Sequence, residues 1–205
     1  MMARSLGCVK AVLRGRGLAG KFPASSGNLD ETMLPIDPIT TRRLVIRPFD
    51  EGDLDAAYRV SSDPEARRFT GGVLSRAESD RGLRGHIDRV SQSGLGARAV
   101  VQSRSHQMIG YCGLQRLADT EEIELFYGYA IHAWGRGFAT EAATALVDLG
   151  FRRLQTERLV AIVHPGNLAS LRVLEKLGFL RSGTYPHPRW KVEHLFLELR
   201  RRPDS

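Results

Sequence analysis

The sequence predicts an α/β fold with a single-layer, mixed, mostly antiparallel sheet that helices flank. The first observation is the order of the segments, because strand-like segments follow one another in the middle of the chain and alternate with helical segments toward its end. The second is composition, since 42% hydrophobic and 26% charged residues are ordinary for a globular protein. A chain of 205 residues is also long enough to form one core, so one folded domain is expected.

In the first part of this domain, the sequence predicts one strand and two helices. Segment 43–49 contains the apolar run Leu-Val-Ile of 44–46 and a proline near its end, which is typical of a strand. A helix is expected over 53–60, because acidic residues stand in its first turn. A second helix is expected over 78–90, beyond the break at Gly71 and Gly72.

Three strands are expected next, with no helix between them. Segments 97–102 and 108–114 flank the polar turn 103–106 and predict a hairpin. A further strand is expected over 121–130. Strands joined by short turns pair in antiparallel fashion, so this part of the sheet is expected to be antiparallel.

The last part of the chain alternates helix and strand. In order, we expect a helix over 139–149, a strand over 158–163, a helix over 168–177 and a strand over 190–199. Gly150 and Gly178 stand where the two helices are expected to end, because glycine favours the residue after a helix.

The positive charge is concentrated near the N-terminus. The formal net charge is +7, yet residues 1–29 hold five basic residues and no acidic one, which leaves +2 for the rest. Glycines interrupt any helix there, so we expect a basic, disordered extension over residues 1–35 and a folded domain over 42–202. A tail, an over-extended start and a targeting peptide all stay open for the extension, although the glycines spoil the amphipathic helix of a transit peptide.

A glycine-containing loop precedes the helix expected at 139–149. It reads Trp-Gly-Arg-Gly-Phe-Ala-Thr-Glu over residues 134–141. Gly135 and Gly137 let several backbone N–H groups converge on an anion at a helix N-terminus, and Arg136 adds a positive charge. A dinucleotide fingerprint would need glycine at Thr140, and no Gly-Lys-Ser/Thr is present. The loop therefore indicates a pyrophosphate site, with a tight turn that serves only the fold as the alternative.

Two polar residues stand at the start of the helix expected at 168–177. Asn167 and Ser170 lie on the same side of it and can reach a ligand beside the end of the preceding strand. The alternative is a plain helix cap, because asparagine is a favoured N-cap residue.

These two segments together resemble a known family. The run 124–142, with Asn167-x-x-Ser170 and the following Arg-Val-Leu-Glu-Lys-Leu-Gly-Phe of 172–179, is similar to the GNAT acetyltransferase superfamily. More narrowly, it resembles the ribosomal-protein N-terminal acetyltransferases, whose loop reads Trp-Gly-x-Gly-Tyr-Ala-Thr-Glu-Ala. The resemblance covers about residues 43–201 and implies a GNAT fold.

The resemblance implies acetyl-CoA as co-substrate. The loop would hold its pyrophosphate, the strand before the loop would pair with the pantetheine arm, and the next helix would contact the arm from the other side. The implied cofactor-binding residues are Tyr129, Ala130, Gly135, Arg136, Gly137, Phe138, Ala139, Thr140, Asn167 and Ser170.

The resemblance also implies a general base and a general acid. Glu124 falls where many relatives carry a glutamate that removes the proton of the amine, with Glu122 as the fallback on the same face. For both glutamates, the alternative is an ordinary solvent-exposed side chain on a strand. The tyrosine that protonates the thiolate in many relatives is Leu174 here. Ser170 is therefore the first candidate for the acid, Tyr127 a second, and solvent a third.

The implied function is an N-acetyltransferase that transfers acetyl directly to a primary amine, either a protein N-terminus or a small-molecule amine. One alternative is a relative that binds CoA without catalysis, motivated by Leu174. Another is a basic ribosome- or RNA-binding protein, motivated by the net charge. The near-neutral domain weighs against a nucleic-acid partner.

Cysteine usage and hydropathy indicate the compartment of the protein and which partners to exclude. Cys8 and Cys112 fit neither a disulfide framework nor metal-ligand spacing, so we expect a reducing compartment, the cytoplasm, and no metal. No apolar run approaches the roughly 20 residues that cross a bilayer, so no membrane partner is expected. The expected partners are acetyl-CoA and an amine acceptor, in a monomer or homodimer.

Overall fold

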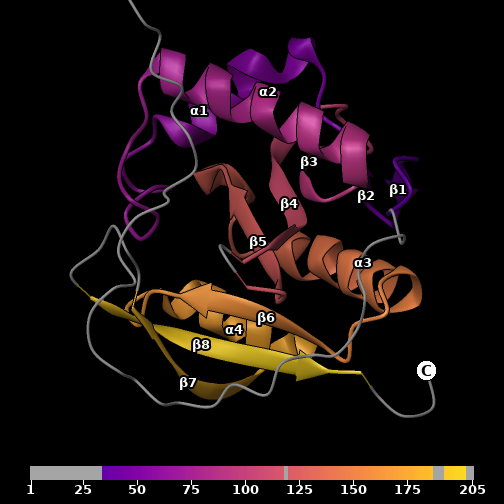
Figure 1. Ribbon diagram of the computed structural model, residues 1–205. Coiled ribbons are helices and arrows are strands. Elements are labelled where there is room, and N and C mark those ends of the chain that lie inside the picture. Colours follow the sequence, from indigo (N-terminus) through magenta and orange to yellow (C-terminus); the bar gives the residue numbers. More distant parts are fainter. Residues whose placement is uncertain (1–33, 118–119, 187–191, 202–205) are drawn as a thin grey trace, which may run out of the picture.

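The computed structural model describes residues 34–117, 120–186 and 192–201 (Figure 1). The residues predicted to form the N-terminal extension, up to 33, lie outside this range, as do 190 and 191 of the last predicted strand. The strands are β1 (Ile39–Thr40), β2 (Leu44–Arg47), β3 (Gly96–Gln102), β4 (Met108–Arg116), β5 (Ile123–Tyr129), β6 (Arg158–Val163), β7 (Leu180–Pro186) and β8 (Glu193–Arg200). The α-helices are α1 (Leu54–Ser61), α2 (Arg76–Ser93), α3 (Phe138–Arg153) and α4 (Leu168–Leu177).

The described strands form one eight-stranded sheet in the order β1-β2-β3-β4-β5-β6-β8-β7. Neighbouring strands are antiparallel except β5 and β6, which are parallel. Parallel neighbours need a long crossover, and α3 supplies it between β5 and β6. The predicted α/β fold with a mixed, mostly antiparallel sheet is therefore confirmed.

The structure also differs from the predicted elements. Strands β1 and β7 were not predicted, because β1 has only two residues and β7 is largely exposed. Helix α3 does not end at Gly150 but continues to Arg153. Gly150 is buried there, and a Cβ on it would lie 2.8 Å from a methyl group of Leu114. This glycine lets α3 approach β4 closely instead of ending the helix.

The packed part of the chain begins before residue 42. Leu34 is only 2% exposed and belongs to the main core cluster. The buried guanidinium of Arg98 donates to the carbonyl oxygen of Pro35 at 2.6 Å and to that of Asp37 at 3.4 Å. Residues 34 and 35, which the sequence assigned to the extension, thus pack against the sheet.

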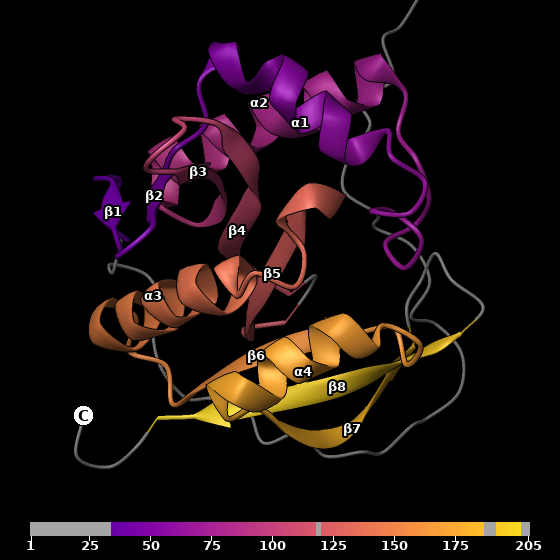
Figure 2. The same cartoon turned by 180° about the vertical axis from the view of Figure 1, so that it is seen from behind.

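Helices cover both faces of the sheet (Figures 1 and 2). Helix α3 packs on β4 and β5 and against α4, and its buried residues belong to the main core cluster. Helices α1 and α2 pack on the opposite face, where Phe49, Leu83 and the alanines of β3 form a second cluster. Because side chains alternate along a strand, β5 places Phe126 on the α1/α2 face and Tyr127 on the α3/α4 face.

The sheet separates between β5 and β6. Seven residue pairs join β4 to β5, whereas only Glu124 and Val160 form a register pair between β5 and β6 in the described chain. Figures 1 and 2 show the two strands diverging from this end. We call the region beyond the Glu124–Val160 pair, bordered by Leu125–Tyr129 of β5 and by β6, the opening.

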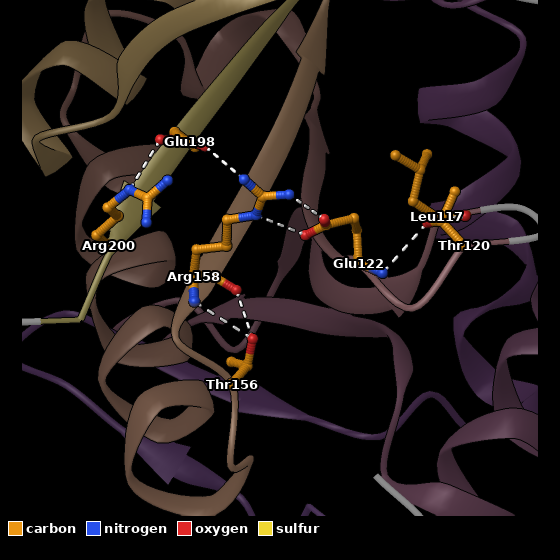
Figure 3. Close-up of polar contacts among 7 residues, drawn as sticks. All are labelled: Leu117, Thr120, Glu122, Thr156, Arg158, Glu198 and Arg200. Atoms are coloured by element: carbon orange, nitrogen blue, oxygen red, sulfur yellow. Dashed lines mark hydrogen bonds and ion pairs between the residues drawn. The ribbon is translucent and has the colours of Figure 1, made fainter. Parts of the chain in front are cut away.

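An ion-pair cluster holds the strands together at the closed end of the opening (Figure 3). The guanidinium of Arg158 on β6 donates to both carboxylate oxygens of Glu122 and, at 2.9 Å, to Glu198 on β8. Arg200 donates to the other oxygen of Glu198 at 3.0 Å. The Arg158 side chain is 7% exposed. Glu122, the fallback base, is thus the ion-pair partner of a buried arginine.

Candidate active site

The loop before α3 leaves a helix N-terminus uncapped. Gly135 and Gly137 have φ angles of 70° and 78°, which residues with a Cβ rarely adopt. Gly137 is the N-cap residue of α3, and no side chain of the described chain caps this end. The first N–H groups of a helix have no partner within the helix, so those of Phe138, Ala139 and Thr140 are available to an anion.

Two side chains outside the loop fix its position. The Glu141 carboxylate in the first turn of α3 accepts from Arg43 Nε at 2.6 Å and from Thr41 Oγ1 at 2.7 Å. Arg43 also donates through Nη1 to the carbonyl oxygen of Arg136 at 2.9 Å. Partial burial would raise the pKa of Glu141, but these hydrogen bonds outweigh it and hold the pKa below its usual value. Sequence reasoning missed Arg43, because 98 positions separate it from Glu141.

The edge of β5 faces the opening. Ala130 N–H donates to the carbonyl oxygen of Ile109 at 3.0 Å. Hydrogen-bonded pairs alternate along an antiparallel ladder, so the N–H and C=O groups of Tyr127 and Tyr129 point away from β4 and toward the opening. The Tyr129 carbonyl accepts from the indole N–H of Trp134 at 2.9 Å. The Tyr129 N–H faces the opening as well, because it lies on the same side of the strand as its carbonyl.

Ala130 differs from this arrangement. Its N–H is bonded to β4, and its carbonyl oxygen accepts from Ala133 N–H at 2.9 Å. Both of its backbone groups thus have partners within the chain, so the predicted backbone pairing of Ala130 with a pantetheine arm would compete with these bonds.

A pair of hydroxyl groups joins β5 to α4. The Tyr127 hydroxyl lies 2.8 Å from Ser170 Oγ and donates to the Ser170 carbonyl at 3.3 Å. Burial raises the pKa of Tyr127 above its ordinary value. The Ser170 N–H donates to Asn167 Oδ1 at 3.1 Å, so Asn167 caps α4. Leu174 is fully buried in the core and brings no hydroxyl to this position.

Glu124 lies at the last register pair before the opening. Its carboxylate accepts a hydrogen bond from Gln115 Nε2 on β4 at 2.8 Å. Burial raises its pKa from 4.5 to about 7, and the Gln115 hydrogen bond opposes this only in part. The Glu124 side chain shares its face with Phe126, whereas Tyr127 lies on the other face. The opening therefore has a carboxyl group on one face of β5 and a hydroxyl pair on the other.

Two further features are absent from the described part of the chain. There, no group of three or more histidine, cysteine, aspartate or glutamate side chains has a geometry that suits a metal ion. None of the helices in the ranges described above is long and apolar enough to cross a membrane.

Comparison with known proteins identifies the class and the family. Residues 43–180 match the family described as acetyltransferase (GNAT) domain, which is more than half of the chain. The uncharacterized N-acetyltransferase YoaA of Bacillus subtilis strain 168 is 31% identical over 156 residues, which cover 74% of this chain and 86% of YoaA. The protein is an N-acetyltransferase. It belongs to the GNAT acetyltransferase family.

Solved structures agree with the fold. An acetyltransferase from Agrobacterium tumefaciens strain C58 superposes with a TM-score of 0.70 at 28% identity, covering 82% of this chain and 96% of its own. A ribosomal-protein-S5-alanine acetyltransferase from Vibrio fischeri has a TM-score of 0.66 at 16% identity, covering 80% and 96%. The second likeness shows the fold alone, so the ribosomal-protein branch stays a prediction.

Proposed function

We propose that this enzyme transfers the acetyl group of acetyl-CoA directly to a primary amine, either a protein N-terminus or a small-molecule amine. One observation carries the proposal: the sheet opens directly after the Glu124–Val160 pair. The opening has a carboxyl group on one face and the Tyr127–Ser170 hydroxyl pair on the other. A proton acceptor and a proton donor thus border the same region, as aminolysis of a thioester requires.

The residues around the opening fit acetyl-CoA. The uncapped N-terminus of α3, with the backbone of Gly135 to Thr140, supports binding of the pyrophosphate. The N–H groups of Tyr127 and Tyr129 on the free edge of β5 support pairing with the amide-containing arm. Bound there, acetyl-CoA supplies an acetyl group activated as a thioester.

Glu124 acts as the general base. An ammonium group has no lone pair, so it must lose a proton before its nitrogen attacks the carbonyl carbon. A carboxyl group with a pKa of about 7 accepts this proton near neutral pH, directly or through one water molecule. A new C–N bond forms, and the C–S bond breaks with its electron pair leaving on sulfur.

The Tyr127–Ser170 pair supplies the proton that the departing thiolate needs. Ser170 donates it, and the Tyr127 hydroxyl, 2.8 Å from Ser170 Oγ, holds the serine in place and replaces the proton. The Tyr129 N–H faces the opening and stabilises the negative charge that develops on the thioester oxygen. The tyrosine of many relatives is absent at Leu174, so this pair takes over its role.

The test measures free thiol released from acetyl-CoA with a panel of amines that includes peptides with free N-termini, amino acids and polyamines. Wild type should release thiol with at least one acceptor, and Glu124→Gln should lower kcat by roughly 10²- to 10⁴-fold. The wild-type rate should rise with pH through an apparent pKa near 7, which the variant loses.

Two results would count against the proposal in different ways. CoA binding without thiol release from any amine would favour a non-catalytic relative. An unchanged rate and pH profile in Glu124→Gln would exclude Glu124 as the base but leave acetyl transfer intact.

A further inference from the structure

Two polar side chains lie side by side across β4 and β5, at the last register pair before the opening. Gln115 on β4 and Glu124 on β5 are directly opposite each other in this antiparallel ladder. Ala130 N–H donates to Ile109, and every second pair along a ladder is hydrogen-bonded, so Gln115 and Glu124 form another such pair. Opposite residues share one face of the sheet, and here both backbones hold the two side chains in register.

The Gln115 amide contacts one oxygen of the carboxylate. Nε2 of Gln115 donates to Oε2 of Glu124 at 2.8 Å, which is an ordinary hydrogen-bond length. Within the described ranges, no other group donates to the Glu124 carboxylate. A donor at Oε2 disfavours a proton on the same oxygen, so Oε1 is the oxygen that remains for a proton.

The remaining neighbours of Glu124 along the sheet are apolar. Val160, its register partner on β6, is fully buried and has no polar side chain. Phe126, the next residue of β5 on the same face, is apolar as well. Among the described residues, it is therefore the Gln115 hydrogen bond that orients the carboxylate between these neighbours.

The other ionisable groups described on this face are not partners of Glu124. They are Tyr111 on β4, Glu122 before β5, Arg158 on β6, Glu198 and Arg200 on β8, and His86 on α2. The two arginines and the two glutamates of this set pair with each other, so their charges balance. His86 stacks on Phe126, and burial lowers the pKa of this histidine to about 4, so the ring is uncharged near neutral pH.

The two glutamates of this region differ in how many oxygens are occupied. The guanidinium of Arg158 donates to both carboxylate oxygens of Glu122, so neither is left for a proton. The Glu124 carboxylate has a neutral amide on one oxygen only. A neutral donor orients a carboxylate without placing a positive charge beside it, and a positive charge would make the group a weaker base.

We infer that Gln115 is a positioning residue for acetyl transfer: its amide holds Oε2 of Glu124 and so leaves Oε1 to take the proton of the acceptor amine. The N–H bond of the ammonium breaks, an O–H bond forms at Oε1, and the electron pair stays on nitrogen for attack on the thioester. This role rests on the proposed function, since Gln115 works through Glu124 as the base.

The experiment compares Gln115→Met and Gln115→Lys with wild type. Methionine keeps the length of the side chain but has no N–H donor, whereas lysine replaces the neutral donor with a cation. The matched control is Arg116→Met, because Arg116 is the next residue on β4, points to the other face and is 41% exposed. For each protein, kcat and the KM for acetyl-CoA are measured from about pH 5.5 to pH 9 with an amine that wild type acetylates, and the melting temperature confirms folding.

The two variants should shift the pH profile in opposite directions. The Gln115 hydrogen bond favours ionised Glu124, so its loss in Gln115→Met should raise the apparent pKa of kcat by about 1 and lower the maximal kcat roughly tenfold. The KM for acetyl-CoA should be unchanged. The cation in Gln115→Lys should lower the apparent pKa by about 1 or more. Arg116→Met should match wild type, and partial unfolding would lower kcat at every pH without moving the apparent pKa.

A second measurement needs no acceptor. In urea unfolding, the stability difference between Glu124→Gln and its parent grows over the pH range in which folded Glu124 ionises. That range should extend to higher pH when Gln115→Met is the parent, and no movement would overturn the inference.

The outcomes separate this inference from the proposed function. If both Gln115 variants keep the wild-type kcat and apparent pKa while Glu124→Gln lowers the rate, Gln115 has no positioning role and the proposed base stands. If Glu124→Gln leaves the rate and its pH profile unchanged, the proposed base and the role of Gln115 fail together. If Gln115→Lys does not fold, the direction of the shift in Gln115→Met decides.

Discussion

Replacing Glu124 with glutamine should make the folded protein more stable, and the gain should grow with pH. The folded-state pKa of this carboxyl is raised from 4.5 to about 7 by burial. In the unfolded chain it loses its proton near pH 4.5, whereas in the folded protein it keeps the proton up to about pH 7. Ionisation thus lowers wild-type stability as pH rises from 4.5 to 7, and glutamine, which has no charge to bury, avoids this cost.

The size of the effect follows from the two pKa values. The two pKa values differ by about 2.5, and one pKa unit corresponds to about 1.4 kcal/mol, so the full cost of ionising Glu124 is at most about 3.5 kcal/mol. The free energy of unfolding of Glu124→Gln, relative to wild type, should therefore rise by about 2.5 kcal/mol between pH 5 and pH 8. The amide oxygen of glutamine can still accept the Gln115 hydrogen bond, which keeps the substitution local.

Urea unfolding at pH 5, 6, 7 and 8 measures this difference. Asp88→Asn is the matched control, because it removes a carboxylate that is exposed on α2 and has no ion-pair partner in the described chain. Its stability difference from wild type should stay within about 0.5 kcal/mol at every pH. A Glu124→Gln difference that does not change with pH, or that becomes destabilising at pH 8, would refute the argument that burial holds this proton.

Three further predictions concern the ion-pair cluster, the α3–β4 contact and the hydroxyl pair. Arg158→Met leaves two carboxylates without their shared partner and should lower the free energy of unfolding by about 3–5 kcal/mol in urea titrations. Gly150→Ala forces a Cβ to within 2.8 Å of a core methyl group and should cost about 1–3 kcal/mol in the same assay. Tyr127→Phe and Ser170→Ala should each lower kcat, and the double variant should lower it no further than the more harmful single substitution, because the two hydroxyl groups act as a unit.

Matched substitutions check the reasons behind these predictions. Arg200→Met removes a cluster arginine whose side chain is 60% exposed, and it should cost less than about 1 kcal/mol. Gly82→Ala on α2 places a Cβ where nothing lies within 4 Å, and it should stabilise the protein by about 0.5–1 kcal/mol. Equal losses from the two arginines, or from the two glycines, would contradict the packing argument. Multiplicative losses at the hydroxyl pair would mean that the two groups act separately.

The sequence predicted the elements whose period and end signals are local. The long helices, the hairpin and the loop before α3 follow from apolar spacing and glycine positions, and they stand in the structure close to where they were expected. Short or exposed strands such as β1 and β7 lack that signal, because their pairing depends on neighbours distant in sequence. Gly150 was misassigned because its packing neighbour is also distant in sequence. From the sequence alone, a glycine that allows close packing cannot be told from one that ends a helix.

In the candidate site, only the residues that belong to a local sequence motif were predictable. The contacts that fix it join residues far apart in the chain, such as Arg43 with Glu141 and Arg158 with Glu122. Ser103 was assigned to a polar turn, and nothing local indicates that its hydroxyl is buried. Such long-range contacts need the folded structure.

The indole of Trp134 makes the loop before α3 suitable for optical measurement. The side chain is 42% exposed, stands next to Gly135 and donates its N–H to the Tyr129 carbonyl at the edge of the opening. The chain has one other tryptophan, at position 190, so Trp190→Phe leaves a single tryptophan, which can be excited selectively above the tyrosine absorption. Its emission wavelength and quenching then report occupation of the loop and of the β5 edge in real time, with no label attached.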